Sequence, residues 1–235
     1  MSDDPYTVTI TMSAGTVTAL SKSGNVLFGL RAVETSDRAA VPVVWMARSE
    51  YALTTRVGYG TELRAYTSTS PIVDGKAVEM GFDVAIAKGQ LLTVTDKGGA
   101  GKVTRDDMPR VVAVLNKTSD PYTCGVAELS SVPTPVCAIP LHGNGNLLMN
   151  PVPKLFLQFA TTEVGTSTAM STSGGPGVLI DQSAAPRVEL TFDIDTAWTG
   201  NVQPEVEQIA PWTPLAPLLS RCSPVLADLA ARRFR

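Results

Sequence analysis

Three segments of the chain alternate strictly between apolar and polar side chains, and this alternation constrains the fold more than any other feature. In residues 6–12 apolar side chains alternate with three threonines, and the same period of two recurs over residues 78–84 and 188–194. Successive side chains of a β-strand point to opposite faces, so such a strand buries one face and exposes the other. The pattern predicts sheets that each turn one face toward a core.

Further strand candidates follow one another between turns rich in glycine and proline. We expect residues 16–20 to form the middle strand of a meander, between strands at residues 6–12 and 26–33. The other candidates span residues 91–94, 110–115, 124–129, 136–140, 154–159 and 178–181. Many short strands at this spacing are typical of two packed sheets. The prediction is an all-β fold, a two-sheet antiparallel β-sandwich with a short C-terminal helix or tail.

The composition supports a β-rich globular protein. Charged residues make up 17 % of the chain and apolar residues 44 %, whereas a typical domain has about a quarter charged residues. These values exclude a disordered chain, a coiled coil and a helical bundle rich in charged helix formers. The net charge is -3 and no basic stripe is present, so nucleic acid is not an expected partner.

Neither a transmembrane segment nor a secretory signal is expected. No apolar run approaches the roughly 20 residues that span a bilayer. The chain starts with acidic residues and passes directly into a strand pattern, whereas a secretory signal starts with basic residues followed by an apolar stretch. We therefore expect a cytoplasmic protein.

The end of the chain has a different pattern from the rest. We expect one β-sandwich domain over residues 1–205, followed at 206–235 by a Pro-rich linker and a C-terminal helix or disordered tail. Ser223 and Pro224 suit the N-cap and the first position of a helix. Such a helix could cover the sandwich or bind a partner.

Three cysteines, Cys124, Cys137 and Cys222, are present. An odd number does not suit a disulfide framework, and we expect free thiols. One bridge between Cys124 and Cys137 stays open as an alternative in an oxidising compartment. A zinc site is not expected, because the chain has one histidine and no Cys-x-x-Cys motif.

Several aromatic and polar residues fall outside the clearest strand patterns and are candidates for ligand binding. Trp198 and Asn201 lie in a turn-like sequence, and His142 and Asn144 lie in a loop rich in glycine and asparagine. Tyr59 and Tyr66 lie in a stretch that also contains arginines. An aromatic ring in a loop can stack on a sugar or sit at a membrane interface. The alternative is that these rings are buried and only fill the core. These six residues are the predicted ligand-binding set.

Acidic residues on one strand form a second candidate site. Glu189, Asp193 and Asp195 share the polar face of the strand at 188–194 and its end. Asp193 and Asp195 could bind a divalent ion such as Ca²⁺, which takes oxygen ligands from loops. The alternatives are a solvated strand face and a catalytic carboxylate pair.

These patterns favour recognition over catalysis. No nucleotide loop, zinc motif, nucleophile elbow or cofactor fingerprint occurs. The leading hypothesis is a non-enzymatic protein that binds a carbohydrate or a lipid surface, lectin-like or cytolysin-like, without a cofactor. One alternative is a cofactor-free enzyme that uses carboxylates, a glycosidase or an isomerase. The other is a self-assembling structural protein, because Val- and Thr-rich edge strands can pair between chains as a homo-oligomer.

Overall fold

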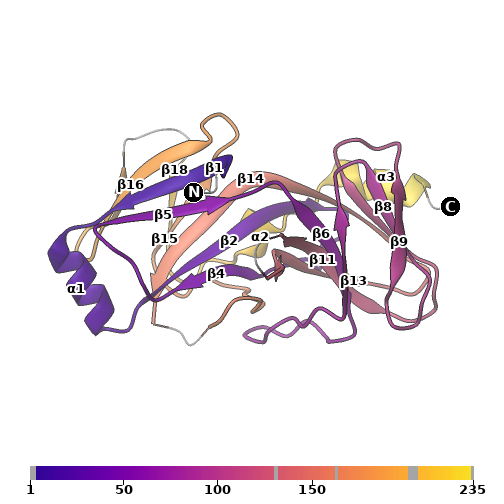
Figure 1. Ribbon diagram of the computed structural model, residues 1–235, viewed down its shortest axis with the longest axis horizontal. Helices are drawn as coiled ribbons and strands as arrows, with labels where there is room; N and C mark the ends of the chain where they lie inside the picture. The colour runs from indigo at the N-terminus through magenta and orange to yellow at the C-terminus, as the bar shows by residue number, and fades with distance from the viewer. Residues whose placement is uncertain (1–3, 130–131, 162–163, 201–205, 234–235) are drawn as a thin grey trace.

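The chain folds into an elongated, mainly β-structured molecule (Figure 1). The computed structural model describes residues 4–129, 132–161, 164–200 and 206–233. Strands account for 50 % of the structure and helices for 10 %. The all-β class and the short C-terminal helix predicted from the sequence are therefore confirmed.

In the described part of the chain the strands form three sheets rather than two. The first sheet has the order β17 (Ala197–Gly200), β16 (Arg187–Asp193), β1 (Tyr6–Thr11), β5 (Thr54–Tyr59). The second has the order β18 (Val206–Ile209), β15 (Gly177–Asp181), β14 (Asn146–Ala160), β10 (Val112–Asn116), β8 (Gln90–Val94), β9 (Gly101–Arg105), and β2 (Val26–Thr35) and β4 (Val44–Arg48) also belong to it. The third has the order β3 (Val41–Pro42), β13 (Cys137–Leu141), β11 (Tyr122–Glu128), β6 (Leu63–Ser68), β7 (Phe82–Ile86), with β12 (Thr134–Pro135) beside β11. Two neighbouring pairs, β1–β16 and β8–β10, are parallel.

The long strand β14 runs through most of the molecule (Figure 1). Its first residues pair with β10 and its last residues with β15, while β2 pairs along its other edge. The register with β2 shifts between Pro151 and Leu155. Pro151 and Pro153 lack an N–H group and cannot donate to a ladder, so the sequence itself enforces this bulge.

The predicted alternation is confirmed in β1 and β16. Val188, Leu190 and Phe192 are buried, and Glu189 and Thr191 are exposed. These apolar faces share a core with the inner face of β14 and β15. Ile194, which the pattern predicted to be buried, is exposed because β16 ends one residue earlier.

Two strand predictions are wrong. Residues 16–20 lie in helix α1 (Ala14–Lys22), whose first turn is capped by Ser13: its Oγ accepts the Thr16 N–H at 3.1 Å. The β-branched residues at the start of this segment resemble a strand, but the Ser13 cap and the burial of Leu20 favour the helix. Residues 78–81 precede β7 as a loop, although Val78 still packs in the core.

The three cysteines are free. Cys124 and Cys137 lie on the neighbouring strands β11 and β13 and are fully buried. Burial raises the pKa of both thiols, that of Cys137 to about 12. Both therefore stay protonated and unreactive at neutral pH.

The C-terminal segment packs against the second sheet. β18 pairs with β15, and the helices α2 (Ala216–Leu219) and α3 (Pro224–Arg233) follow. Leu226 and Ala230 of α3 bury their side chains against β10 and β14. Whether a domain ends at residue 205 stays a prediction.

An ion pair connects the C-terminal end of α3 to the residues that follow β9. Arg233 Nη2 lies 2.7 Å from Asp106 Oδ1 and 3.0 Å from Asp107 Oδ1. Burial acts to raise the pKa of Asp106, but hydrogen bonds from Arg233 and the Met108 N–H outweigh it and hold that pKa below its ordinary value. The Asp106 carboxylate is therefore kept charged by the docked helix.

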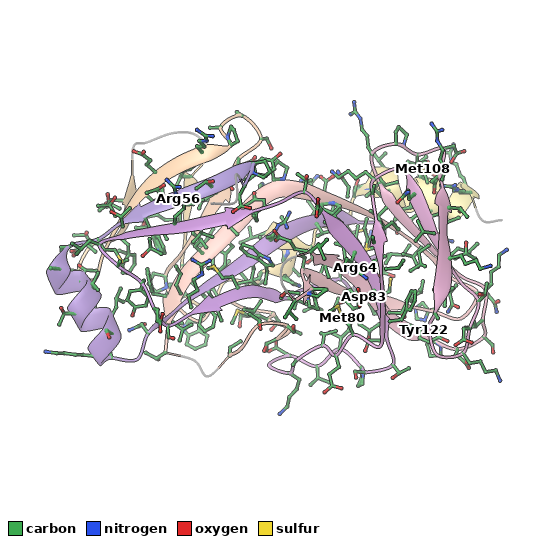
Figure 2. All side chains as sticks on the ribbon, viewed as in Figure 1. Arg56, Arg64, Met80, Asp83, Met108 and Tyr122 are labelled. Carbon is green, nitrogen blue, oxygen red and sulfur yellow. The ribbon has the colours of Figure 1, made fainter. Side chains whose placement is uncertain are left out.

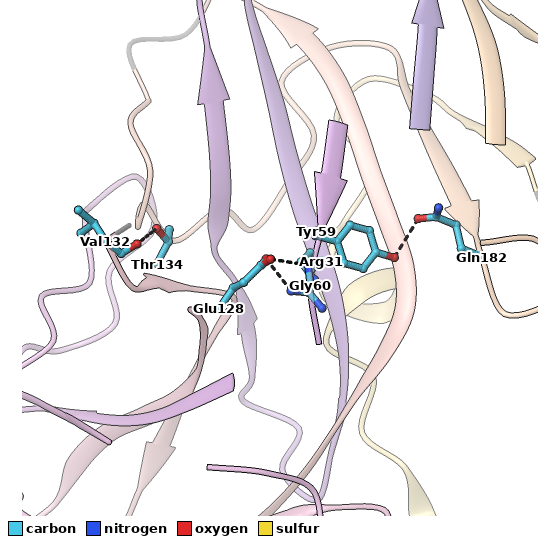
Figure 3. Close-up of polar contacts among 7 residues, drawn as sticks. All are labelled: Arg31, Tyr59, Gly60, Glu128, Val132, Thr134 and Gln182. Carbon is cyan, nitrogen blue, oxygen red and sulfur yellow. Dashed lines mark hydrogen bonds and ion pairs between the residues drawn. The ribbon is translucent and has the colours of Figure 1, made fainter. Parts of the chain in front are cut away.

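A buried polar cluster joins the three sheets (Figure 3). Arg31 on β2 donates to Glu128 on β11 at 2.7 Å, and both side chains are buried. The other Glu128 oxygen accepts the Gly60 N–H at 2.7 Å, at the end of β5. The Arg31 guanidinium also lies over the Tyr59 ring, 4.3 Å from its centroid. One charge pair therefore contacts a strand or strand end from each sheet.

Asp106→Asn should lower the free energy of unfolding by about 1–3 kcal/mol at neutral pH, because a buried charged hydrogen-bond partner is lost. A lowered folded-state pKa adds stability above the ordinary pKa of an aspartate, and this stability is lost as the pH falls through the folded-state value. The difference from the wild type in urea unfolding should therefore shrink below about pH 4. Asp107→Asn is the control and should change little, because that carboxylate is exposed.

Glu128→Leu should lower the free energy of unfolding by about 3–5 kcal/mol, because it leaves the Arg31 charge buried without its partner. The double variant Arg31→Met, Glu128→Leu should be more stable than Glu128→Leu alone. Urea unfolding of the two variants and the wild type gives the coupling between the residues. Additive losses would contradict a direct pair.

Candidate functional site

Trp198, predicted to lie in a turn, is a core residue. It belongs to β17, pairs with Phe192 across the strands, and is 2 % exposed. Its ring stacks on Phe159 and meets Phe192 edge-on, and its Nε1 donates to the Pro176 carbonyl at 3.3 Å. The turn falls just before β17 instead, so the prediction of an exposed ring in a turn is wrong for Trp198.

The two predicted tyrosines are also buried. The Tyr59 hydroxyl donates to Gln182 Oε1 at 2.9 Å (Figure 3). The Tyr66 hydroxyl donates to the Cys137 carbonyl at 2.6 Å. Burial raises the pKa of both phenols. Neither ring offers a face on which a ligand can stack, and both serve to connect strands.

His142 and Asn144 are exposed in the loop between β13 and β14. Asn116 holds this loop through a hydrogen bond to the His142 carbonyl at 3.1 Å, and Asn144 takes the left-handed conformation with φ of 53°. A nearby cavity of about 350 Å³ is lined by Pro140 and Tyr122, among others. Tyr122 lies toward the end of the molecule opposite α1 (Figure 2). Asn201 lies outside the described residues.

The acidic residues near the end of β16 form part of a turn. Asp193 Oδ1 accepts the Asp195 N–H at 3.0 Å, and Oδ2 accepts the Thr16 hydroxyl at 2.8 Å. The Asp195 N–H and then the Thr16 hydroxyl lower the pKa of Asp193. One oxygen therefore holds the turn after β16, and the other contacts α1. Among the described residues no group of three or more His, Cys, Asp or Glu could hold a metal, so Ca²⁺ binding by Asp193 and Asp195 stays a prediction.

These acids do not share a site with the histidine. Asp193 lies on the first sheet beside α1, whereas the His142 loop follows β13 of the third sheet and is held by Asn116. The structure brings Tyr59 close to Arg31 and Glu128, but that group is enclosed. The predicted site residues are therefore distributed over several parts of the molecule.

Among the described residues, Trp212 is the aromatic side chain exposed to solvent. It is 75 % exposed and has a φ of 64°. A bulky residue rarely takes this left-handed conformation, which costs about 1–3 kcal/mol. Such strain persists only where surrounding contacts hold it, and it often marks a functional position.

Ser173 holds the backbone on both sides of this ring. The Trp212 N–H donates to the Ser173 carbonyl at 3.1 Å, and the Thr213 N–H donates to Ser173 Oγ at 3.0 Å. The same Oγ donates to the Ala210 carbonyl at 3.0 Å. Ser173 is fully buried. The segment that carries Trp212 is therefore fixed before any ligand arrives.

A small pocket of about 170 Å³ lies beside Trp212. Asp74, Thr172 and Met170 are among the side chains that line it, with the backbone of Gly75 and Gly174. Asp74 Oδ1 accepts the Ser171 N–H at 2.7 Å, which ties the two loops of the pocket together. The pocket combines an aromatic ring, a carboxylate and hydroxyl groups.

The sequence around Trp212, expected to be a Pro-rich linker, carries a signal for this site. Trp212 stands between Pro211 and Pro214, in a segment with neither a strand nor a helix period. Prolines that close together keep a segment out of a sheet interior. A tryptophan in such a segment has few ways to reach a core.

Comparisons of the chain with protein-family models, curated proteins and solved structures give no match. None of the helices in the described ranges has the length and apolar character needed to cross a membrane.

The three tryptophans should differ in access to a fluorescence quencher. Trp212→Phe should remove most of the fluorescence that acrylamide quenches readily, because Trp45 is only partly exposed and Trp198 is buried. Trp198→Phe should leave the easily quenched fraction in place. Equal quenching of the two variants would contradict this assignment of exposed and buried rings.

Proposed function

We propose that this chain is a carbohydrate-binding protein whose ligand stacks on Trp212 and donates hydrogen bonds to Asp74. The observation that carries the proposal is an exposed tryptophan, held in a strained backbone conformation, beside a mainly apolar pocket that also presents the Asp74 carboxylate. One face of a sugar ring is apolar and packs on an indole, and its hydroxyl groups suit a carboxylate.

The size of the pocket fits one sugar unit. Its volume of about 170 Å³ is below the roughly 300–1,000 Å³ of sites for drug-sized ligands. A longer oligosaccharide would place one ring in the pocket and extend over the surface.

A carbohydrate fits this site better than a membrane surface does. Asp74 and Thr172 lie in the pocket and are exposed. A carboxylate at this place would repel anionic lipids and would be costly to bury among acyl chains. Binding to lipid vesicles is therefore the alternative outcome of the experiment below.

Binding is also favoured over hydrolysis. A glycosidase generally needs two carboxyl groups about 5–9.5 Å apart on either side of the scissile bond. Asp74 is the one acidic residue among the described residues that line the pocket. The pocket therefore suits a lectin-like protein better than an enzyme that uses paired carboxylates.

Trp212→Gly separates binding from folding. Glycine takes a positive φ without strain, so this variant should melt at the same temperature as the wild type or higher. Its affinity for a sugar identified on a glycan array should fall about tenfold or more, because the stacking surface is lost. Calorimetric titration and thermal melting measure the two effects.

Two further variants sharpen this test. Trp212→Phe keeps a ring and should retain part of the affinity, and Asp74→Asn should weaken binding because the amide accepts hydrogen bonds less strongly. Unchanged sugar affinity in Trp212→Gly, or binding to vesicles in place of glycans, would overturn the proposal.

A further inference from the structure

We propose a second binding site, for an alkyl carboxylate, in a cavity of about 730 Å³ where the ends of the β6–β7 hairpin meet the turn before β8. This site is separate from the Trp212 pocket, and the two share no lining residue. The ligand would place its alkyl chain against aliphatic side chains and its carboxylate against Lys88.

The walls of the cavity are mainly aliphatic. Leu63 and Ile86, which are paired across β6 and β7, contribute side chains that are almost fully buried. Leu129 lies 41 % exposed on another wall. The volume is within the usual range of ligand sites, roughly 300–1,000 Å³. Leu129, Ala85 and Ala87 supply the aliphatic surface that is open to water, and an alkyl chain would bury it.

Lys88 supplies the positive charge that would bind the ligand carboxylate. Its Nζ donates to Asn150 Oδ1 at 2.9 Å and to the Pro151 carbonyl at 2.7 Å, and an ammonium has a third hydrogen to donate. Both partners are neutral, and the Lys88 ammonium has no ion pair with a carboxylate within the described ranges. The carboxylate of Glu34 accepts a hydrogen bond from Asn150 instead.

The surroundings of Lys88 disfavour its charged form unless an anion lies beside it. Lys88 is exposed as a residue, but its ammonium group is hydrogen-bonded to Asn150 and Pro151. This partial burial lowers the pKa of Lys88, and the Arg31 charge lowers it further, while Glu34 acts in the opposite direction. An anionic head group would restore the charge balance that the neutral partners leave incomplete.

Glu62 restricts the kind of anion. It lines the same cavity and is exposed. A second negative charge on the ligand would be repelled by this carboxylate. The arrangement therefore favours a head group with one charge, such as a carboxylate, over a phosphate.

Calorimetric titration with octanoate, decanoate, decanol and inorganic phosphate tests the site. We expect saturable one-to-one binding of decanoate, about 15-fold tighter than octanoate, because each buried methylene strengthens binding about fourfold. Phosphate should not bind. Failure of decanoate to bind, or binding of phosphate at the same site, would overturn the proposal.

Two variants test whether Lys88 is the residue that binds the carboxylate of the ligand. Lys88→Met should weaken decanoate binding about tenfold or more and leave decanol binding unchanged, since a charged hydrogen bond is lost. Lys102→Met, at an exposed lysine on the edge strand β9, is the matched control and should have no effect. Equal decanoate affinity in both variants would show that Lys88 is not the carboxylate partner.

Two more variants keep the test informative if Lys88→Met folds poorly. Glu62→Gln should tighten decanoate binding, and Leu129→Asp should weaken it about tenfold or more, because it adds a charge to an apolar wall. Both residues are exposed, so thermal melting should change little. Trp212→Gly should leave decanoate affinity unchanged, which distinguishes a failure here from a failure of the sugar site.

Discussion

The ion pair between Arg31 and Glu128 is the interaction on which the arrangement of the three sheets depends. Taking two charges out of water is unfavourable unless their remaining hydrogen-bonding groups find partners. Glu128 accepts the Gly60 N–H, and the Arg31 guanidinium lies over the rings of Tyr59 and Trp45, although its Nε is buried without a hydrogen-bond partner. Gln182 extends the network, since it accepts from Tyr59 and donates to the Pro186 carbonyl at the start of β16. Each sheet therefore supplies a partner to this cluster, and separating the sheets would break the Arg31–Glu128 and Glu128–Gly60 hydrogen bonds.

The position of this pair follows from the bulge in β14. Leu155, the first residue paired after the bulge, lies opposite Arg31 in the ladder. Pro151 still pairs with Val33 of β2, and its carbonyl accepts from Lys88 Nζ. Within the bulge, the Pro153 carbonyl accepts from the Gln182 N–H. The two prolines thus explain both the concentration of polar groups at the centre of the molecule and the place where Lys88 is held. Lys88, the charged residue beside the 730 Å³ cavity, is held in place by Asn150 and Pro151 of this irregular strand.

The sequence predicted what depends on local pattern and failed where tertiary contacts decide. The alternation in β1 and β16 was sufficient to predict their buried faces, because a period of two is a property of the strand itself. Helix α1 was mistaken for a strand because its threonine and valine favour strands, while the outcome depends on the Ser13 cap and on the burial of Leu20. Trp198 and Trp212 show the same limit at the site. Trp198 is buried because β17 turns back along β16, and Trp212 is exposed because Ser173, 39 residues earlier in the numbering, fixes its backbone. The prolines beside Trp212 indicate a segment outside the sheets, but neither the pairing of β17 nor the contact with Ser173 can be derived from the residues around each tryptophan.

The two proposed sites lie at opposite ends of one hairpin. Leu63 and Ile86 border the larger cavity, and the loop that joins the other ends of β6 and β7 carries Asp74 to the Trp212 pocket. The paired strands from Leu63 to Thr67 separate these ends by roughly 14 Å, at about 3.4 Å per residue. An ion pair between Arg64 and Asp83 reinforces the ladder (Figure 2). A rigid hairpin of this length keeps a sugar ring and an alkyl carboxylate from touching each other. The hairpin also carries both sites on loops and strand ends. Residues that face ligands can therefore be substituted without changing the sheets.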